Sequence, residues 1–192
     1  ASALSDAEVL NVLRTIDDRQ RNSGDYKSLV FIEHKQRDKN DLVYESVVYR
    51  RDESDQLIIL TLKPKAEAGK GYLRIDKNLF LYDPTVGRWE RRTERERIGG
   101  TSMRRSDFDE SRLAEEFAAR FVGAEKLGRF QVWHLKLVAK EGADVPFPQV
   151  HMWVDQASGN VLKTQDRALS GKLMRTTYTP KWDKVYSESK GE

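Results

Sequence analysis

The sequence predicts an α+β protein in which one long antiparallel sheet of about ten strands is accompanied by two or three helices. Two observations carry this prediction. Most of the chain consists of short segments rich in Val, Ile, Leu and Tyr, and the connections between them are too short for parallel crossovers. Apolar residues recur at helical spacing in only two segments. Because the chain has 192 residues, we expect one domain spanning residues 1–192.

The first helical segment begins at a capping box formed by Ser5 and Glu8 and ends near Arg21. Its apolar stripe consists of Val9, Val12, Leu13 and Ile16. A second helix is predicted from Asp109 to about Phe121, because Leu113, Phe117 and Phe121 follow one another at intervals of four.

The strand segments alternate with turn residues such as Gly159-Asn160 and Ser170-Gly171. Several strands have apolar residues on both faces. In the first strand, for example, Leu29 and Phe31 point to one face and Val30 and Ile32 to the other. Either helices cover both faces of the sheet, or one apolar face lines a cavity. The predicted strands are Tyr26–Arg37, Leu42–Arg51, Gln56–Lys63, those within the hairpin Gly71–Arg92, Phe130–Lys140, Phe147–Asp155, Val161–Arg167 and Lys172–Thr179.

Composition excludes several classes of protein. The 34 basic residues are nearly balanced by 31 acidic ones, so charge gives no indication of nucleic-acid binding. The chain has no cysteine, which excludes disulfides, thiolate metal sites and a cysteine nucleophile. No apolar run is long enough for a transmembrane helix, and the first residues carry no signal-peptide core. We expect that, if the protein is exported, its signal peptide has already been removed.

Motifs of catalysis and cofactor binding are missing from the sequence. His34, His134 and His151 each fall inside a predicted strand and show no metal-binding spacing, so we expect structural histidines and no metal site. The glycines at 123 and 128 have the spacing of a phosphate-binding loop but lack the Lys-Ser/Thr that would follow. We expect no cofactor and no enzymatic activity.

Three segments resemble known motifs. The stretch LFLYDP at Leu79–Pro84 is similar to the strand and turn of the bacterial outer-membrane lipoprotein-sorting carriers, the LolA/LolB-like superfamily. His151–Trp182 resembles the closing three strands of that family, and SDFDESRL at Ser106–Leu113 is similar to an element of a subfamily of lipoprotein-sorting proteins. The sequence departs from the subfamily at Arg112, where an acidic residue is usual.

The resemblance implies a fold, a place and an activity. The fold would be an incomplete, half-open antiparallel β-barrel closed by helices. The protein would be a periplasmic, monomeric carrier that binds lipoprotein acyl chains or another lipid in an apolar cavity. It would take cargo from an inner-membrane transporter towards an outer-membrane acceptor. The same fold in envelope-stress regulators offers a lipid sensor as an alternative, and a hydrolase using His134 or His151 with a nearby acid is a third.

The carrier hypothesis assigns roles to particular side chains. In this hypothesis the helix carrying Leu113, Phe117 and Phe121 is a lid over the cavity. The alternative is that these three side chains are part of an ordinary hydrophobic core. Partner or head-group contacts are expected from Arg91, Arg92 and Arg95, because seven arginines stand between positions 88 and 105 against three glutamates. A solvated, salt-bridged edge strand explains the same arginines equally well. The expected cavity lining or lid residues are Phe31, Leu79, Leu81, Trp89, Leu113, Phe117, Phe121, Trp133 and Leu135.

Overall fold

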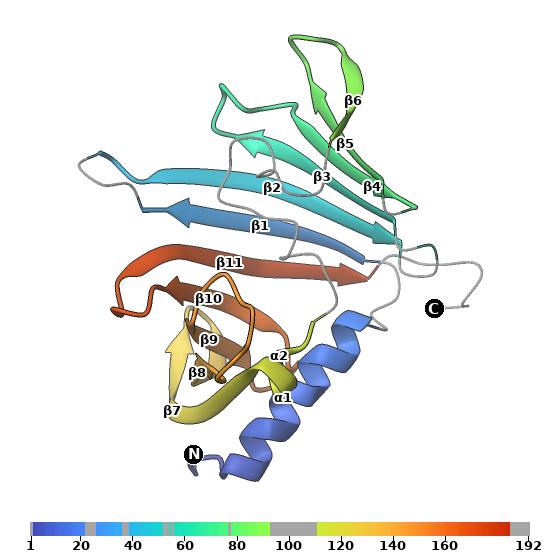
Figure 1. Ribbon diagram of the computed structural model, residues 1–192. Coiled ribbons are helices and arrows are strands. Elements are labelled where there is room, and N and C mark those ends of the chain that lie inside the picture. The colour runs from blue at the N-terminus through green and yellow to red at the C-terminus, as the bar shows by residue number, and fades with distance from the viewer. Residues whose placement is uncertain are drawn as a thin grey trace. The chain divides into compact units, whose positions relative to one another are not determined.

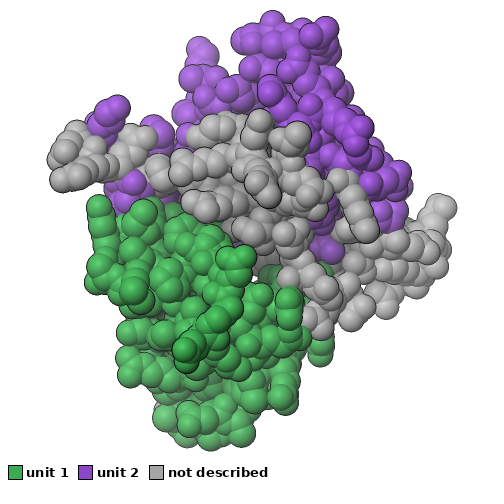
Figure 2. Space-filling model, viewed as in Figure 1, with its two compact units in different colours: residues 1–21, 110–178 green, residues 22–109, 179–192 purple. Residues whose placement is uncertain are grey.

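A computed structural model describes residues 2–21, 26–35, 39–51, 54, 56–76, 78–92 and 111–184 (Figure 1). The chain divides into two compact units (Figure 2). Unit 1 comprises residues 1–21 and 110–178, and unit 2 comprises residues 22–109 and 179–192. Arg95 and most of the motif at Ser106–Leu113 lie outside the described residues.

Eleven strands form one sheet in the order β6-β5-β4-β3-β2-β1-β11-β10-β9-β8-β7. The pairings described residue by residue are all antiparallel, and β6 and β7 stand at the two ends of the order. The predicted antiparallel sheet that does not close is therefore confirmed. The elements are α1 (Asp6–Arg21), β1 (Tyr26–His34), β2 (Leu42–Arg51), β3 (Gln56–Lys63), β4 (Gly71–Ile75), β5 (Asn78–Asp83), β6 (Arg88–Arg92), α2 (Leu113–Glu116), β7 (Phe117–Leu127), β8 (Phe130–Ala139), β9 (Gln149–Asp155), β10 (Val161–Arg167) and β11 (Leu173–Lys184).

The predicted capping box opens α1. The Ser5 amide donates to Glu8 Oε2 at 2.7 Å, and the Glu8 amide donates to Ser5 Oγ at 3.3 Å. The first of these bonds lowers the pKa of the Glu8 carboxyl. The helix then runs for 16 residues and buries three residues of the predicted stripe, Val9, Leu13 and Ile16, to at most 4% exposure, while Val12 is half-buried.

In unit 1, α1 fills one face of the sheet formed by β7 to β10 (Figure 1). Because successive side chains on a strand alternate between faces, β8 and β9 supply every second residue to this core, whereas β10 contributes only Val161. Burial of this much apolar surface is the main favourable contribution to the stability of the unit. The fully buried members are Val9, Leu13, Ile16, Phe117, Leu135, Leu137, Val150, Met152 and Val154.

The helix predicted from Asp109 to Phe121 is wrong. Helix α2 is only four residues long, and Phe117–Leu127 is strand β7, paired with β8. A spacing of four residues is close to one helical turn, but it is also two full periods of a strand. Phe117, Ala119 and Phe121 therefore face α1 at strand spacing, and Gly123 lies within the same strand.

Two polar contacts hold α1 in unit 1 besides its apolar stripe. Asp17, only 5% exposed, accepts hydrogen bonds from the Leu113 and Ala114 amides, each at 2.9 Å, and from the Ser111 hydroxyl. It thereby satisfies the first amides of α2, a role that an N-cap residue usually has. Two residues further along the C-terminal part of α1, the Arg19 guanidinium donates to the Ser158 carbonyl in the turn between β9 and β10.

Unit 2 is a meander of strands β1 to β6, joined by short turns. Ile75 pairs with Asn78, which leaves a two-residue turn between β4 and β5. Asp76 occupies the left-handed region with φ 50°, a conformation that Asp tolerates better than most residues. All described helical residues of the protein belong to unit 1, so the core of unit 2 is built from strands.

We expect Asp17→Ala to lower the free energy of unfolding by about 1 to 3 kcal/mol, because buried amides lose their acceptor. Asp18 is the next residue on α1 and is exposed, so Asp18→Ala serves as the matched control and should change stability by no more than about 0.5 kcal/mol. Urea unfolding followed by circular dichroism measures both. Equal losses in the two variants would contradict a role of Asp17 in joining α1 to α2.

Candidate functional site

One face of the sheet of unit 2 is both apolar and buried. We call it the Tyr72 face and define it as the side of strands β1 to β6 on which the Tyr72 side chain lies. Seven apolar residues on it are between 1% and 5% exposed: Ile32, Tyr44, Val48, Leu57, Ile59, Tyr72 and Leu79. They come from five different strands, and partly buried Val30, Leu42 and Leu81 pack against them.

The strand register arranges the Tyr72 face in two long cross-strand rows. The first row consists of Ser28, Val48, Ile59, Tyr72, Leu81 and Glu90. The second consists of Arg50, Leu57, Arg74, Leu79 and Arg92. Directly opposed side chains in a sheet lie about 5 Å apart, so an apolar row runs beside a row in which arginine alternates with leucine.

Arg74 is the most buried of the three arginines in the second row, which we call the arginine row. Its side chain is 6% exposed and stands between Leu57 and Leu79. A guanidinium stays charged even when buried, and its planar fork of donors matches carboxylates and phosphates. The face therefore combines apolar surface with three arginines, one of which, Arg92, forms an ion pair with Glu90 on the same face. Sequence reasoning missed this because only the register brings the three arginines together.

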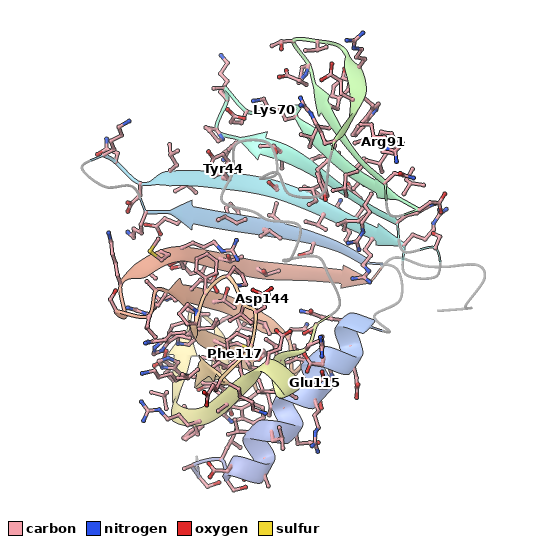
Figure 3. All side chains as sticks on the ribbon, viewed as in Figure 1. Tyr44, Lys70, Arg91, Glu115, Phe117 and Asp144 are labelled. Carbon is pink, nitrogen blue, oxygen red and sulfur yellow. The ribbon has the colours of Figure 1, made fainter. Side chains whose placement is uncertain are left out.

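Lys70 and Tyr44 lie in the same part of unit 2 (Figure 3). Burial raises the pKa of the Tyr44 hydroxyl, and the negative charge of Glu67 raises it further. Glu67 forms an ion pair with Lys70 at 2.6 Å, and this hydrogen bond raises the pKa of the Lys70 ammonium. The turn between β3 and β4 thus places paired charges beside the apolar face.

The opposite side of the same strands, which we call the Trp89 face, is apolar but much less buried. Trp89 lies over Gly71, since a Cβ built on Gly71 would come within 2.9 Å of the Trp89 ring. The ring also contacts Tyr82, with centroids 5.3 Å apart. Gly71 therefore has to be glycine for the Trp89 side chain to keep its position.

The predicted lining residues do not gather in one place. Leu79 and Leu81 lie on the Tyr72 face, whereas Phe31 and Trp89 lie on the Trp89 face. The other five belong to the core of unit 1 under α1: Leu113, Phe117, Phe121, Trp133 and Leu135. Phe117 packs against α1, and of the helix that was to form a lid only the four residues of α2 are helical within the described residues. Ligand contact by the nine residues stays a prediction.

The arginines predicted to meet a partner are exposed where they are described. Arg91 donates to Asn78 Oδ1 at 2.6 Å, and Arg92 contacts Glu90 at 3.3 Å. Register places the two on opposite faces, with Arg91 on the Trp89 face and Arg92 at the end of the arginine row. Arg95 lies outside the described residues.

Two of the histidines lie together on the side of unit 1 that faces away from α1. His134 Nε2 and His151 Nδ1 are 2.7 Å apart, and the His134 ring stacks on Trp153 at 4.3 Å between centroids. Burial lowers the pKa of His134; burial, and then the proximity of His134, lowers the pKa of His151 to about 4. Neither ring is hydrogen-bonded to a carboxylate within the described residues, and Glu125 is the acid whose charge acts on His134.

The described side chains include no group of three or more His, Cys, Asp or Glu that could hold a metal ion. No helix in the described part of the chain is long and apolar enough to cross a membrane. Unit 2 presents an apolar face that is crossed by a row containing Arg50, Arg74 and Arg92.

The fold is LolA-like, as three solved structures show. A LolA superfamily protein of Nitrosomonas europaea matches with 15% identity over 94% of both chains and a TM-score of 0.50. A putative outer-membrane lipoprotein-sorting protein domain of Vibrio parahaemolyticus matches with 15% identity, the same coverage and a TM-score of 0.54. In the MucA/MucB complex of Pseudomonas aeruginosa, the similarity covers 95% of this chain and 60% of that chain, at 15% identity and a TM-score of 0.59.

A model of a family described only as "-like: Uncharacterized protein" matches residues 53–189. The match spans more than half of the sequence, so the chain belongs to this family. No curated protein matches the sequence. The resemblance inferred from the sequence motifs is confirmed at the level of the fold.

The histidine pair predicts how stability depends on pH. Because the pKa of each ring is lower in the folded protein than the usual value of about 6.5, the unfolded chain takes up protons first as the pH falls. The pair's contribution is complete above about pH 6.5 and decreases towards pH 4, the region of the folded pKa of His151. Charges near the pair are Glu125, Lys163, Arg167, Lys136 and Arg120.

Urea unfolding at pH 7 and pH 5 measures this effect. In His151→Asn, which keeps a polar side chain but does not titrate, the loss of stability between the two pH values should be clearly smaller than in the wild type. A variant with the same loss as the wild type would show that other groups cause the pH dependence.

Proposed function

We propose that the protein is a periplasmic, non-enzymatic carrier that binds the acyl chains of a lipoprotein or another lipid on the Tyr72 face. The observation that carries this proposal is the composition of that face. Its apolar cluster comes entirely from the strands of unit 2, whereas the corresponding cluster of unit 1 is filled by α1. An acyl chain laid along this face would contribute about 0.8 kcal/mol for each buried CH₂ group.

The arginine row supplies the polar end of such a site. Arg50, Arg74 and Arg92 stand beside the apolar row on the same face. Hydrogen bonds between guanidinium groups and oxyanions are about twice as strong as neutral ones, and they favour planar anions such as carboxylate and phosphate. We therefore infer that the ligand carries an anionic head group, which would compete with the partners that these arginines already have, such as Glu90 for Arg92.

The fold and the sequence support the same proposal from another side. A putative outer-membrane lipoprotein-sorting protein shares the fold, and sequence motifs such as LFLYDP at Leu79–Pro84 resemble those of lipoprotein-sorting carriers. In this function the protein would receive its cargo from an inner-membrane transporter and deliver it to an outer-membrane acceptor. Neither step requires catalysis, in keeping with a site made of apolar side chains and arginines.

A lipid-sensing regulator is the second candidate. The observation that favours it is the similarity to a chain of the MucA/MucB complex, which reaches a TM-score of 0.59. A sensor would use the same Tyr72 face, but lipid binding would change its affinity for a signalling protein. Crosslinking in cells separates the two, because a carrier should be captured with a transporter or a receptor and a sensor with a signalling protein.

Titration with a fluorescent fatty acid tests the carrier. Leu79 and Phe80 are neighbours on β5 but lie on opposite faces, so they form a matched pair. We expect Leu79→Ala to weaken binding about tenfold, equivalent to about 1.4 kcal/mol. Phe80→Ala should stay within about twofold, and an uncharged acyl alcohol should bind the wild type more weakly than the fatty acid.

Both variants remove a packed side chain, so circular dichroism must first show that they are folded at the temperature of the titration. Absence of saturable binding to the folded wild-type protein would refute the carrier. Equal weakening by both substitutions would place the acyl chain elsewhere than on the Tyr72 face.

A further inference from the structure

The Trp89 face of unit 2 is an apolar surface that the carrier function does not use. Register arranges its centre in two adjacent rows across all six strands. One row is Leu29, Val47, Leu60, Gly71, Tyr82 and Trp89, and the other is Lys27, Tyr49, Ile58, Leu73, Phe80 and Arg91. The first row carries no charge, and the second has a cation at each end with four apolar side chains between.

Exposure distinguishes this face from a core. Trp89 is 41% exposed and Tyr49 is 38% exposed, and beside the two rows Val43 and Leu62 reach 51% and 43%. The remaining apolar members of the rows are half-buried, except for the buried Gly71. An apolar patch that spans six strands is larger than scattered surface residues produce, and such patches mark sites of interaction with proteins or membranes.

Charge on this face is uneven. Its acids are ion-paired: Glu33 and the neighbouring Asp41 both contact Lys35, and Glu45 contacts Lys63 at 3.0 Å. Among the described residues Lys27, Arg51 and Arg91 have no acidic partner: Lys27 lies over the Tyr49 ring at 5.3 Å, and Arg91 donates to neutral Asn78. The patch therefore has a net positive charge in addition to its apolar centre.

We propose that the Trp89 face docks on an anionic lipid bilayer surface. Tyr and Trp have apolar rings with one polar atom and favour the boundary between lipid head groups and acyl chains. Lysine and arginine at the ends of an apolar row can keep their stems on the lipid and their charges among the phosphates. Each basic residue near an anionic membrane adds to the attraction. An acidic protein surface would match the charges as well, but the two exposed aromatic rings favour lipid.

Flotation with vesicles tests this proposal on the whole chain. The wild type should bind vesicles of phosphatidylglycerol and phosphatidylcholine more tightly than pure phosphatidylcholine, and salt should weaken this binding. The doubles Tyr49→Ser/Trp89→Ser and Lys27→Gln/Arg91→Gln should each reduce affinity at least about tenfold. The charge variant changes only exposed residues that form no described ion pair, so it tests the proposal even if the aromatic variant fails to fold.

Matched controls lie on unit 1. Val138→Ser/Leu169→Ser removes exposed apolar side chains, and Arg120→Gln/Lys126→Gln removes exposed charges from β7. Both should bind the vesicles within about twofold of the wild type. Three results would each overturn the proposal: the wild type binds both lipid mixtures equally, or the face variants bind vesicles like the wild type. The third is a wild type that does not bind vesicles but forms a concentration-dependent dimer, which is lost in Tyr49→Ser/Trp89→Ser.

Docking is separable from cargo binding. The substituted side chains lie on the opposite face from Tyr72, so the fatty-acid titration should be unchanged in the Lys27→Gln/Arg91→Gln variant. If the wild type does not bind the fatty acid, the carrier is refuted, and membrane docking is still decided by the vesicle experiment.

Discussion

The structure depends on the number of neighbouring strands that a single long helix can cover. Helix α1 has 16 residues, and at 1.5 Å per residue it is about 24 Å long. Strands lie about 4.8 Å apart, so such a helix can cover roughly five neighbouring strands. The sheet has eleven. The strands of unit 1 have their apolar face filled by α1, and unit 2 has an equally apolar face without a described helix of its own.

Polar contacts make the position of α1 specific. Its apolar stripe alone would allow the helix to slide or rotate on the sheet, because apolar contacts have little directionality. Asp17 binds the first amides of α2, and Arg19 binds the turn after β9. The helix is thereby attached at two sites within unit 1. This explains why the residues expected to form a movable lid, Phe117 and Phe121, lie instead in a core under a fixed helix.

Much of the fold could be predicted from the sequence because local signals were strong. The capping box at Ser5 and the strand Val161–Arg167 were predicted as they are found. The region after Asp109 was not, because side chains four apart satisfy both a helix and a strand, and pairing with β8 decided the outcome. Alanines at 114, 118 and 119 favour a helix locally, but the hydrogen bonds of an eleven-residue strand outweigh that preference.

The candidate site was harder to predict than the fold, because it depends on register. Leu79 and Trp89 were both expected to line a cavity, but Trp89 pairs with Tyr82 and so lies on the other face. A one-residue difference in register moves a side chain to the opposite side of a sheet. For the same reason the sequence gives no indication that Arg50, Arg74 and Arg92 form one row, or that His134 and His151 touch.

The central claim is that lipid binds to unit 2 and that unit 1 is filled by its own helix. Hydrogen exchange of the wild-type protein with and without a fatty acid tests it most directly, because bound ligand slows the opening of the strands that it contacts. The account predicts added protection of amides in β2 to β5, with β8 and β9 unchanged. Added protection confined to β8 and β9, or no change anywhere at saturating fatty acid, would contradict it.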